Sequence, residues 1–189
     1  MHDGTGALIE GRLRHAFTRT RLILEGLTDD EFFWEPVEGC WSVRRSTEVE
    51  RAWGVGEWRC EDYWPVPEPP PITTIGWRLV HLAAWTDIYR SYAFEDGSES
   101  LLSMEVPGTA DGAVAWLERA QDRFADALAR LPSGACDELR QAHWGELMPL
   151  STLVGAIDSE HIHHGAEISL LRDLRRGSAH TMQWPRLPL

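Results

Sequence analysis

The sequence of 189 residues contains no lysine and no asparagine, so arginine supplies all 18 basic side chains. Acidic residues outnumber them, because 30 Asp and Glu residues give a formal net charge of −12. This balance argues against a nucleic-acid partner, since binding to the phosphate backbone requires a cationic surface. The same shortage of basic residues disfavours a helix that lies on a membrane surface.

Long hydrophobic runs are also missing, and none approaches the roughly 18 residues that a membrane-spanning helix needs. The first residues, 1–4, lack the basic and apolar regions of a signal peptide. Only three cysteines occur, and their odd number and irregular spacing favour free thiols (Cys40, Cys60 and Cys136). We therefore expect a cytoplasmic protein that binds neither membranes nor nucleic acids.

The apolar residues present recur with a helical period. The chain is 43% hydrophobic and 25% charged, which is typical of a globular domain with a sizeable core. The spacing predicts four helices of roughly 20 residues, over about 5–27, 75–94 and 110–131 and from directly after Pro149 to about 175. Few strand signals accompany them. We expect an all-α protein, an antiparallel four-helix bundle that forms one domain over 1–189.

Several residues are typical of helix ends. Thr28 and Glu31 have the spacing of a capping box and predict a short extra turn. Thr73 or Thr74 is the expected N-cap of the second long helix, and Ser151 lies near the expected start of the fourth. Arginines followed by Gly177 indicate where the fourth helix ends.

The helical period disappears over residues 36–71, which are rich in tryptophan and proline. A connection of this length without secondary structure is unusual unless it has a function. It can be an aromatic-anchored connection packed over the bundle, or a lid or wall for a ligand pocket. The residues leave both interpretations open.

The fourth predicted helix carries an unusual cluster of ionisable side chains in its middle. Because an α-helix turns about 100° per residue, Glu160 and His164 lie about 40° apart and one turn from each other. His164 falls near the centre of the apolar stripe, with Glu160 on one shoulder and His161 on the other, while His163 points aside. A buried carboxylate needs a partner, either a hydrogen-bond donor or a cation.

A second helix offers one further histidine in a comparable position. His81 lies in the middle of the predicted helix 75–94, on an apolar face between Trp77 and Trp85. Two imidazoles and one carboxylate would leave a coordination position open, as in catalytic metal sites. Spacing alone also allows His161 in place of Glu160, and it allows a metal-free cluster in which these groups hydrogen-bond one another.

These motifs together resemble the DinB-like (DinB/YfiT) superfamily of metalloenzymes. The resemblance rests on the 28–36 turn, on the 77–82 segment after the proline-rich run, and on the 163–174 segment. It implies a four-helix bundle with one divalent metal ion, most often zinc or nickel. Carried over to this sequence, the implied ligands are His81, Glu160 and His164.

The sequence departs from the commonest pattern of that family, which has histidine where Glu160 stands. The His/Glu/His version resembles the mycothiol-dependent maleylpyruvate isomerase branch. That resemblance implies mycothiol or a similar low-molecular-weight thiol as co-substrate, a small electrophile as substrate, and a homodimer. It favours Glu160 over His161 as a ligand.

Two functions follow as hypotheses. One is a metal-dependent thiol S-transferase or isomerase, or a hydrolase, whose pocket is walled by Trp77, Trp85 and Tyr92. Glu167 and His163 can then hydrogen-bond the ligands and orient them, or they can form a solvated salt bridge or a cap at the surface. The alternative is a non-catalytic stress or sensor module that binds a metal or a small ligand on the same bundle, because no independent nucleophile motif is present.

Overall fold

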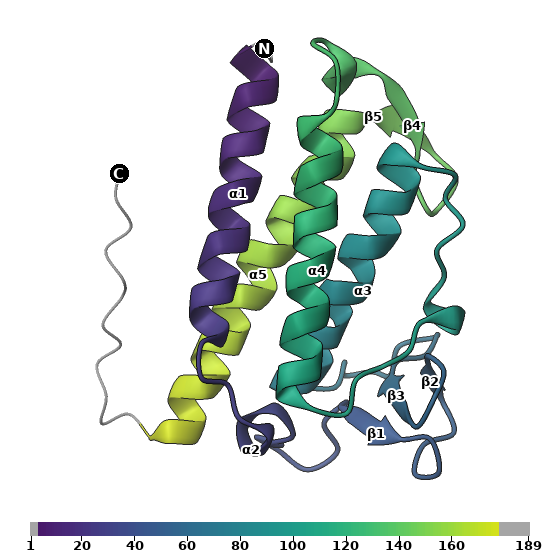
Figure 1. Ribbon diagram of the computed structural model, residues 1–189. Coiled ribbons are helices and arrows are strands. Elements are labelled where there is room, and N and C mark those ends of the chain that lie inside the picture. The colour runs from purple at the N-terminus through teal and green to yellow at the C-terminus, as the bar shows by residue number, and fades with distance from the viewer. Residues whose placement is uncertain (1–3, 178–189) are drawn as a thin grey trace.

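The computed structural model describes residues 4–177, and the chain over this range is mostly helical (Figure 1). Residues 178–189, for which the sequence predicts an extended conformation, lie outside the described residues. The α-helices are α1 (Gly4–Leu24), α2 (Asp29–Phe32), α3 (Ile75–Phe94), α4 (Ala110–Ala129) and α5 (Leu150–Arg176). The strands are β1 (Val43–Arg45), β2 (Ala52–Trp53), β3 (Trp58–Glu61), β4 (Leu139–Gln141) and β5 (Leu147–Pro149), with short 3-10 turns at Leu101–Ser103 and Ala135–Asp137.

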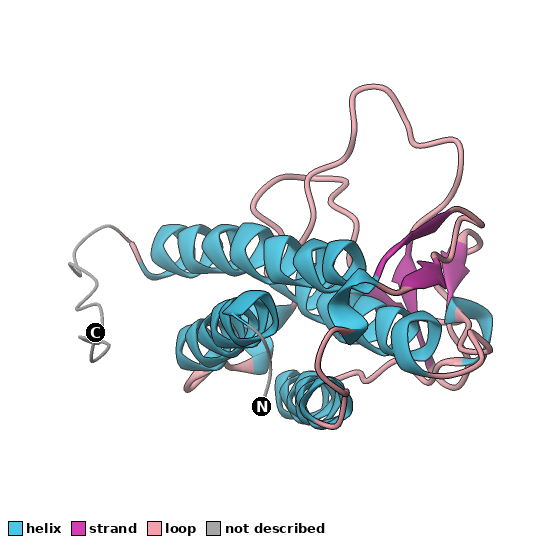
Figure 2. Cartoon of the chain, turned by 90° about the horizontal axis from the view of Figure 1, so that it is seen from above, coloured by secondary structure: helices cyan, strands magenta, loops and turns pink. Residues whose placement is uncertain are grey.

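The four long helices contact one another in a ring. α3 packs against α4 and α5, and α1 packs against the same two helices from the other side. Apolar side chains of all four fill the interior, and Phe124, Leu79 and Ile157 are among those fully buried. Figure 2, seen from above, shows the strands gathered at one side of the molecule, where loops extend beyond the helices. No helix within the described residues has the length and apolarity that crossing a membrane requires.

Most helix ends agree with their sequence signals. Thr28 and Glu31 form the predicted capping box, and Thr74 accepts a hydrogen bond from the backbone N–H of Trp77 at the start of α3. α5 begins directly after Pro149, as expected, but Ser151 does not cap it. Instead the backbone N–H of Leu150 donates to the carbonyl of Glu138, because the preceding β5 strand leads directly into the helix.

The 36–71 connection is not without structure, contrary to the expectation from its lost helical period. It contains an antiparallel sheet of three strands in the order β1-β3-β2, in which Cys60 pairs with Val43 on one side and Trp53 on the other. These strands span only two to four residues each, too few for an alternating pattern to stand out in the sequence. The indole N–H of Trp77 donates to the carbonyl of Glu61, which attaches the sheet to α3.

One buried ion pair ties the ends of three helices together. The guanidinium of Arg172 on α5 donates to both carboxylate oxygens of Glu31 on α2, at 3.3 and 3.1 Å, and also to the carbonyls of Ile23 and Glu25 at the end of α1. Arg176 donates to the same carboxylate at 2.7 Å. Burial alone raises the pKa of Glu31, but the hydrogen bonds from the two arginines outweigh it and the pKa is lowered.

We expect the Glu31→Gln variant to lose about 3 kcal/mol of its free energy of unfolding at pH 7, because it leaves the Arg172 charge buried without a counterion. The wild type should lose this contribution as the pH falls below the ordinary carboxyl value, since protonation of Glu31 is easier in the unfolded chain. Urea unfolding at pH 7 and pH 4 measures both effects, and the variant should show the flatter pH dependence.

Asp126→Asn is the matched control, because its ion pair with Arg130 spans 3.9 Å and both side chains are largely exposed. It should change stability by less than about 0.5 kcal/mol. Equal losses for the two variants would contradict the role given to Glu31.

Candidate metal centre

Three side chains from α3 and α5 converge on one point. The Glu160 carboxylate oxygen Oε2 lies 3.2 Å from Nε2 of His164 and 3.5 Å from Nε2 of His81. The possible ligand atoms of the three residues all lie within 4.8 Å of one another. The His164 side chain is 9% exposed and that of Glu160 is 36% exposed, so the cluster is anchored in the protein but open to solvent on one side.

Helix geometry explains this convergence. Glu160 and His164 are one turn apart on α5, so their side chains project from the same face. α3 packs directly against that face, and there the His81 ring lies 4.9 Å from the His164 ring, between centroids. Trp77, one turn before His81, stacks on its imidazole at 4.7 Å with 18° between the ring planes, which restrains the orientation of the ring.

The hydrogen bonding of Nδ1 in His164 bears on whether Nε2 of the same ring donates or accepts. Its Nδ1 lies 2.7 Å from Oε2 of Glu167, and because an ionised carboxylate only accepts hydrogen bonds, this contact is a hydrogen bond in the tautomer that carries the proton on Nδ1. In the neutral imidazole, Nε2 is then an acceptor that faces another acceptor, the Glu160 oxygen. Two acceptors at 3.2 Å repel each other unless a proton or a metal cation lies between them.

The electrostatics of the cluster agree with this demand for positive charge. With a proton between the partners, hydrogen bonding to His164 and then to His81 holds the pKa of Glu160 far below its usual value, so the carboxylate stays ionised. Burial lowers the pKa of His81 and favours its neutral form. Its Nδ1 is buried without a hydrogen-bond partner. An anionic oxygen therefore faces at least one imidazole that resists protonation.

Glu167 and Arg78 form an outer layer around His164. The Arg78 guanidinium on α3 makes an ion pair with Oε2 of Glu167, the oxygen that also accepts from His164. This arrangement holds the imidazole in one tautomer and directs Nε2 toward Glu160. Arg78 lies within the sequence motif around His81, but the spacing carried no sign of its contact with α5.

A second group of possible ligands consists of His163, His164 and Glu167. The His163 side chain is 64% exposed, and its Nε2 lies 3.3 Å from Oε1 of Glu167. This group is the poorer cation site, because the Arg78 guanidinium already neutralises Glu167 and its charge repels a metal ion. His163 thus lies beside Glu167 at the surface.

His161, the alternative ligand in the sequence, lies elsewhere. It belongs to neither of the two groups, and its ring packs 4.6 Å from the ring of Phe17 on α1. Its Nδ1 donates to the carbonyl of Ile157 at 2.9 Å, and burial lowers its pKa to about 4. The helix wheel assigned it to a shoulder of the buried face, but α5 is covered by α1 as well as α3, which buries that shoulder too.

Aromatic rings continue along α3 on both sides of His81. Trp85 follows one turn later at 5.9 Å from the His81 ring, and Tyr89 follows Trp85 at 6.1 Å. Burial and the nearby Glu160 charge raise the pKa of Tyr89, which therefore lies within the field of the cluster. Tyr92, the third residue expected in the pocket wall, lies three turns along the helix from His81, and its ring centroid is 6.4 Å from that of His143.

Two aromatic residues near the cluster, Tyr89 and His143, were not singled out in the sequence. Tyr89 is eight residues after His81, so its helical spacing was sufficient to predict it. His143 could not be predicted, because it comes from the β4–β5 hairpin, whose position over α3 depends on tertiary contacts.

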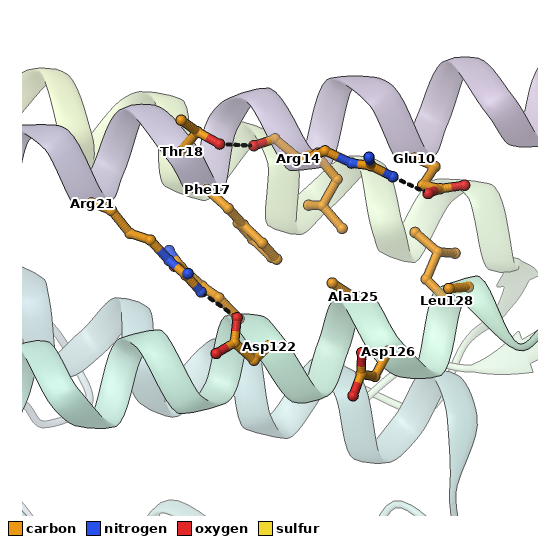
Figure 3. Close-up of a pocket in the computed structure, with 12 residues that line it drawn as sticks. Glu10, Arg14, Phe17, Thr18, Arg21, Asp122, Ala125, Asp126 and Leu128 are labelled. Atoms are coloured by element: carbon orange, nitrogen blue, oxygen red, sulfur yellow. Dashed lines mark hydrogen bonds and ion pairs between the residues drawn. The ribbon is translucent and has the colours of Figure 1, made fainter.

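Cavities elsewhere in the structure do not include the cluster. Figure 3 shows the groove between α1 and α4, where Phe17 and Leu128 face an opening of about 280 Å³ and Arg21 reaches across to Asp122. Three further cavities, of about 280, 470 and 530 Å³, are also lined by other residues than His81, Glu160 and His164. The Glu160 side chain is 36% exposed, which leaves the cluster open to solvent on that side.

The fold and the cluster together define a helical protein with a group of histidine and glutamate side chains that can hold a metal ion. The chain belongs to the DinB superfamily, because the model of that family matches residues 12–168. Membership of this superfamily is associated with metal-binding enzymes. No curated protein and no solved structure gives a match to the chain.

Replacement of His161 tests whether this residue is part of the buried core and not of the neighbouring cluster. His161→Ala should cost about 3 kcal/mol of stability, because it removes a fully buried ring and leaves a cavity against Phe17. Urea unfolding measures the loss, and Ser159→Ala on the exposed face of α5 is the control. A variant as stable as the wild type would contradict the buried position of His161.

Proposed function

We propose that His81, Glu160 and His164 hold one divalent metal ion, zinc or nickel, and that the protein is a metal-dependent enzyme. The observation that carries the proposal is the convergence of two imidazole nitrogens, at 3.2 and 3.5 Å, on one carboxylate oxygen, an arrangement that a shared cation satisfies. Imidazole and carboxylate ligands suit both metals. The four long helices are, on this proposal, the antiparallel bundle of a single DinB-like domain.

The protein supplies three ligands and leaves access for a substrate. With one carboxylate and two neutral imidazoles, the ligand set carries a charge of −1, so the occupied site has a net charge of +1. The exposed side of Glu160 is where a small molecule can approach. A divalent ion bound there would lower the pKa of a water molecule or thiol in contact with it and supply a nucleophile near neutral pH.

We further propose that the substrate pair is a low-molecular-weight thiol of the mycothiol type and a small electrophile. A site with net charge +1 attracts the anionic form of a thiol, and the His/Glu/His ligand set is the feature shared with the thiol-dependent branch. In this role Glu167 and Arg78 orient His164, while Trp77 orients His81 by stacking. The activity is S-transfer or thiol-dependent isomerisation.

Metal binding is the first test. The purified protein should bind one equivalent of Zn²⁺ or Ni²⁺, measured by elemental analysis and by calorimetric titration of the metal-free form. His81→Ala, Glu160→Gln and His164→Ala should each weaken binding by at least about 100-fold, because a direct ligand matters more than the outer partners that contribute 10- to 100-fold. Glu167→Gln should fall in that lower range.

His163→Ala and His161→Ala are matched controls from the same helix, and both should keep wild-type metal affinity. If His161→Ala abolished binding in a folded protein while Glu160→Gln did not, the assignment of Glu160 would be wrong. A wild type without stoichiometric metal, whose melting temperature added Zn²⁺ or Ni²⁺ left unchanged, would overturn the metal site itself.

Turnover is the second test. The metal-loaded protein should consume mycothiol in the presence of a suitable member of a panel of small electrophiles, followed as loss of free thiol. His81→Ala should abolish this activity, whereas His163→Ala should retain it. A metal-loaded wild type that binds the thiol but turns over none of the electrophiles would favour the non-catalytic sensor module.

A further inference from the structure

Side chains spaced one turn apart on α3 form a row of rings that passes through the metal-centre residues. Trp77, His81, Trp85 and Tyr89 follow one another at four-residue intervals, with centroid distances of 4.7, 5.9 and 6.1 Å between neighbours. His81 therefore has an indole on each side along the helix axis. Only one of these two indoles is available to a ligand.

Trp77 is already committed to the protein. It is 8% exposed, its face stacks on His81, and its N–H donates to the carbonyl of Glu61. Trp85 is only half-buried and meets His81 at a 54° tilt, and its N–H makes no such hydrogen bond within residues 4–177. The side of His81 that faces the carboxyl end of α3 is therefore the side on which ring surface remains uncovered.

The tip of the β4–β5 hairpin extends this surface. The His143 ring lies 4.6 Å from Trp85 and 5.4 Å from Tyr89, and Trp144 lies 4.6 Å from His143. Both tip residues are exposed, and the Trp144 N–H donates to Glu146. Neighbouring aromatic rings that are half-buried or exposed, such as these four, are typical of binding sites.

The hairpin is anchored, so its tip is held in place over α3. Ala142, directly before His143, is buried in the core, and Arg140 donates to the carbonyl of Ala93 at the end of α3. The backbone N–H of Ala142 donates to Glu146, which closes the turn. The ring surface is thus preformed, and a ligand would not have to order it.

Charge decides which kind of ring-bearing molecule fits. On the proposed function, the occupied centre has a net charge of +1, which attracts an anionic group and repels a cation. Trp85 and Tyr89 follow His81 along α3 and offer uncharged ring faces on which a ligand can stack. A ligand fits both features if it has an anionic head group that lies beside His81 and Glu160 and a flat apolar body that stacks on the rings.

We propose that Trp85, Tyr89, His143 and Trp144 form the specificity surface of this site, and that they select a thiol or other anionic substrate bearing an aromatic or similarly flat unsaturated group. The preference for an anionic head group rests on the proposed function. The preference for a flat group rests on the ring surface that the β4–β5 hairpin completes.

The test compares two thiols that share a head group, phenylmethanethiol and ethanethiol. Calorimetric titration of the zinc-loaded protein should show about tenfold or stronger preference for phenylmethanethiol, the gain expected from stacking and burial of one ring. The double variant His143→Ala/Trp144→Ala should reduce that preference below about threefold. Its affinity for ethanethiol and its zinc content should stay at the wild-type level. Trp85→Leu should act in the same direction.

Trp64→Leu is the matched control, because Trp64 is the most exposed tryptophan described and lies outside the row of rings. It should leave the preference unchanged. A wild-type preference below threefold, or one that survives in the hairpin double variant, overturns the specificity surface while the metal site stands. Failure to bind zinc overturns the proposed function, and with it the head-group part of this inference.

Discussion

The approach of Glu160 to two imidazoles is the constraint around which the helical core is arranged. A carboxylate oxygen 3.2 and 3.5 Å from two ring nitrogens needs positive charge at that point. Much of the surrounding structure restrains this meeting. α5 holds two of the groups one turn apart, α3 brings the third, and Trp77 and Glu167 orient the two imidazoles. Because the site joins two different helices, any change in the α3–α5 packing would separate its members.

Arginine has a structural function in this protein that its scattered sequence positions do not reveal. Arg172 satisfies Glu31 together with the last carbonyls of α1, and Arg78 satisfies Glu167 beside the candidate metal centre. Both guanidinium groups are largely buried and make several contacts at once, which suits their planar arrangement of donors. The absence of lysine is compatible with this pattern, since a buried point charge would satisfy fewer acceptors.

Much of the fold could be predicted from periodicity alone. The bounds of α3 agree with the sequence pattern to the residue, and the capping box at Thr28 forms as expected. Prediction failed where elements are short or depend on distant partners. The three strands within 36–71 are too brief to show alternation, and the first turn of α5 is held by a hydrogen bond from Leu150 to the distant Glu138 carbonyl instead of by Ser151. His161 lies on the shoulder of the buried stripe where the helix wheel places it, but a helix wheel does not show that α1 covers this shoulder.

The sequence by itself determined the local facts of the site: that Glu160 and His164 share one face of a helix, that His81 lies on an apolar face of another, and that the chain carries the motifs of the DinB superfamily. These follow from the helical repeat, which is a property of the backbone. Tertiary structure decided which of the neighbouring histidines meet, that Arg78 supports Glu167, and that His143 joins the rings of α3. Those contacts join segments far apart in the chain, so they depend on packing between elements and not on spacing within one.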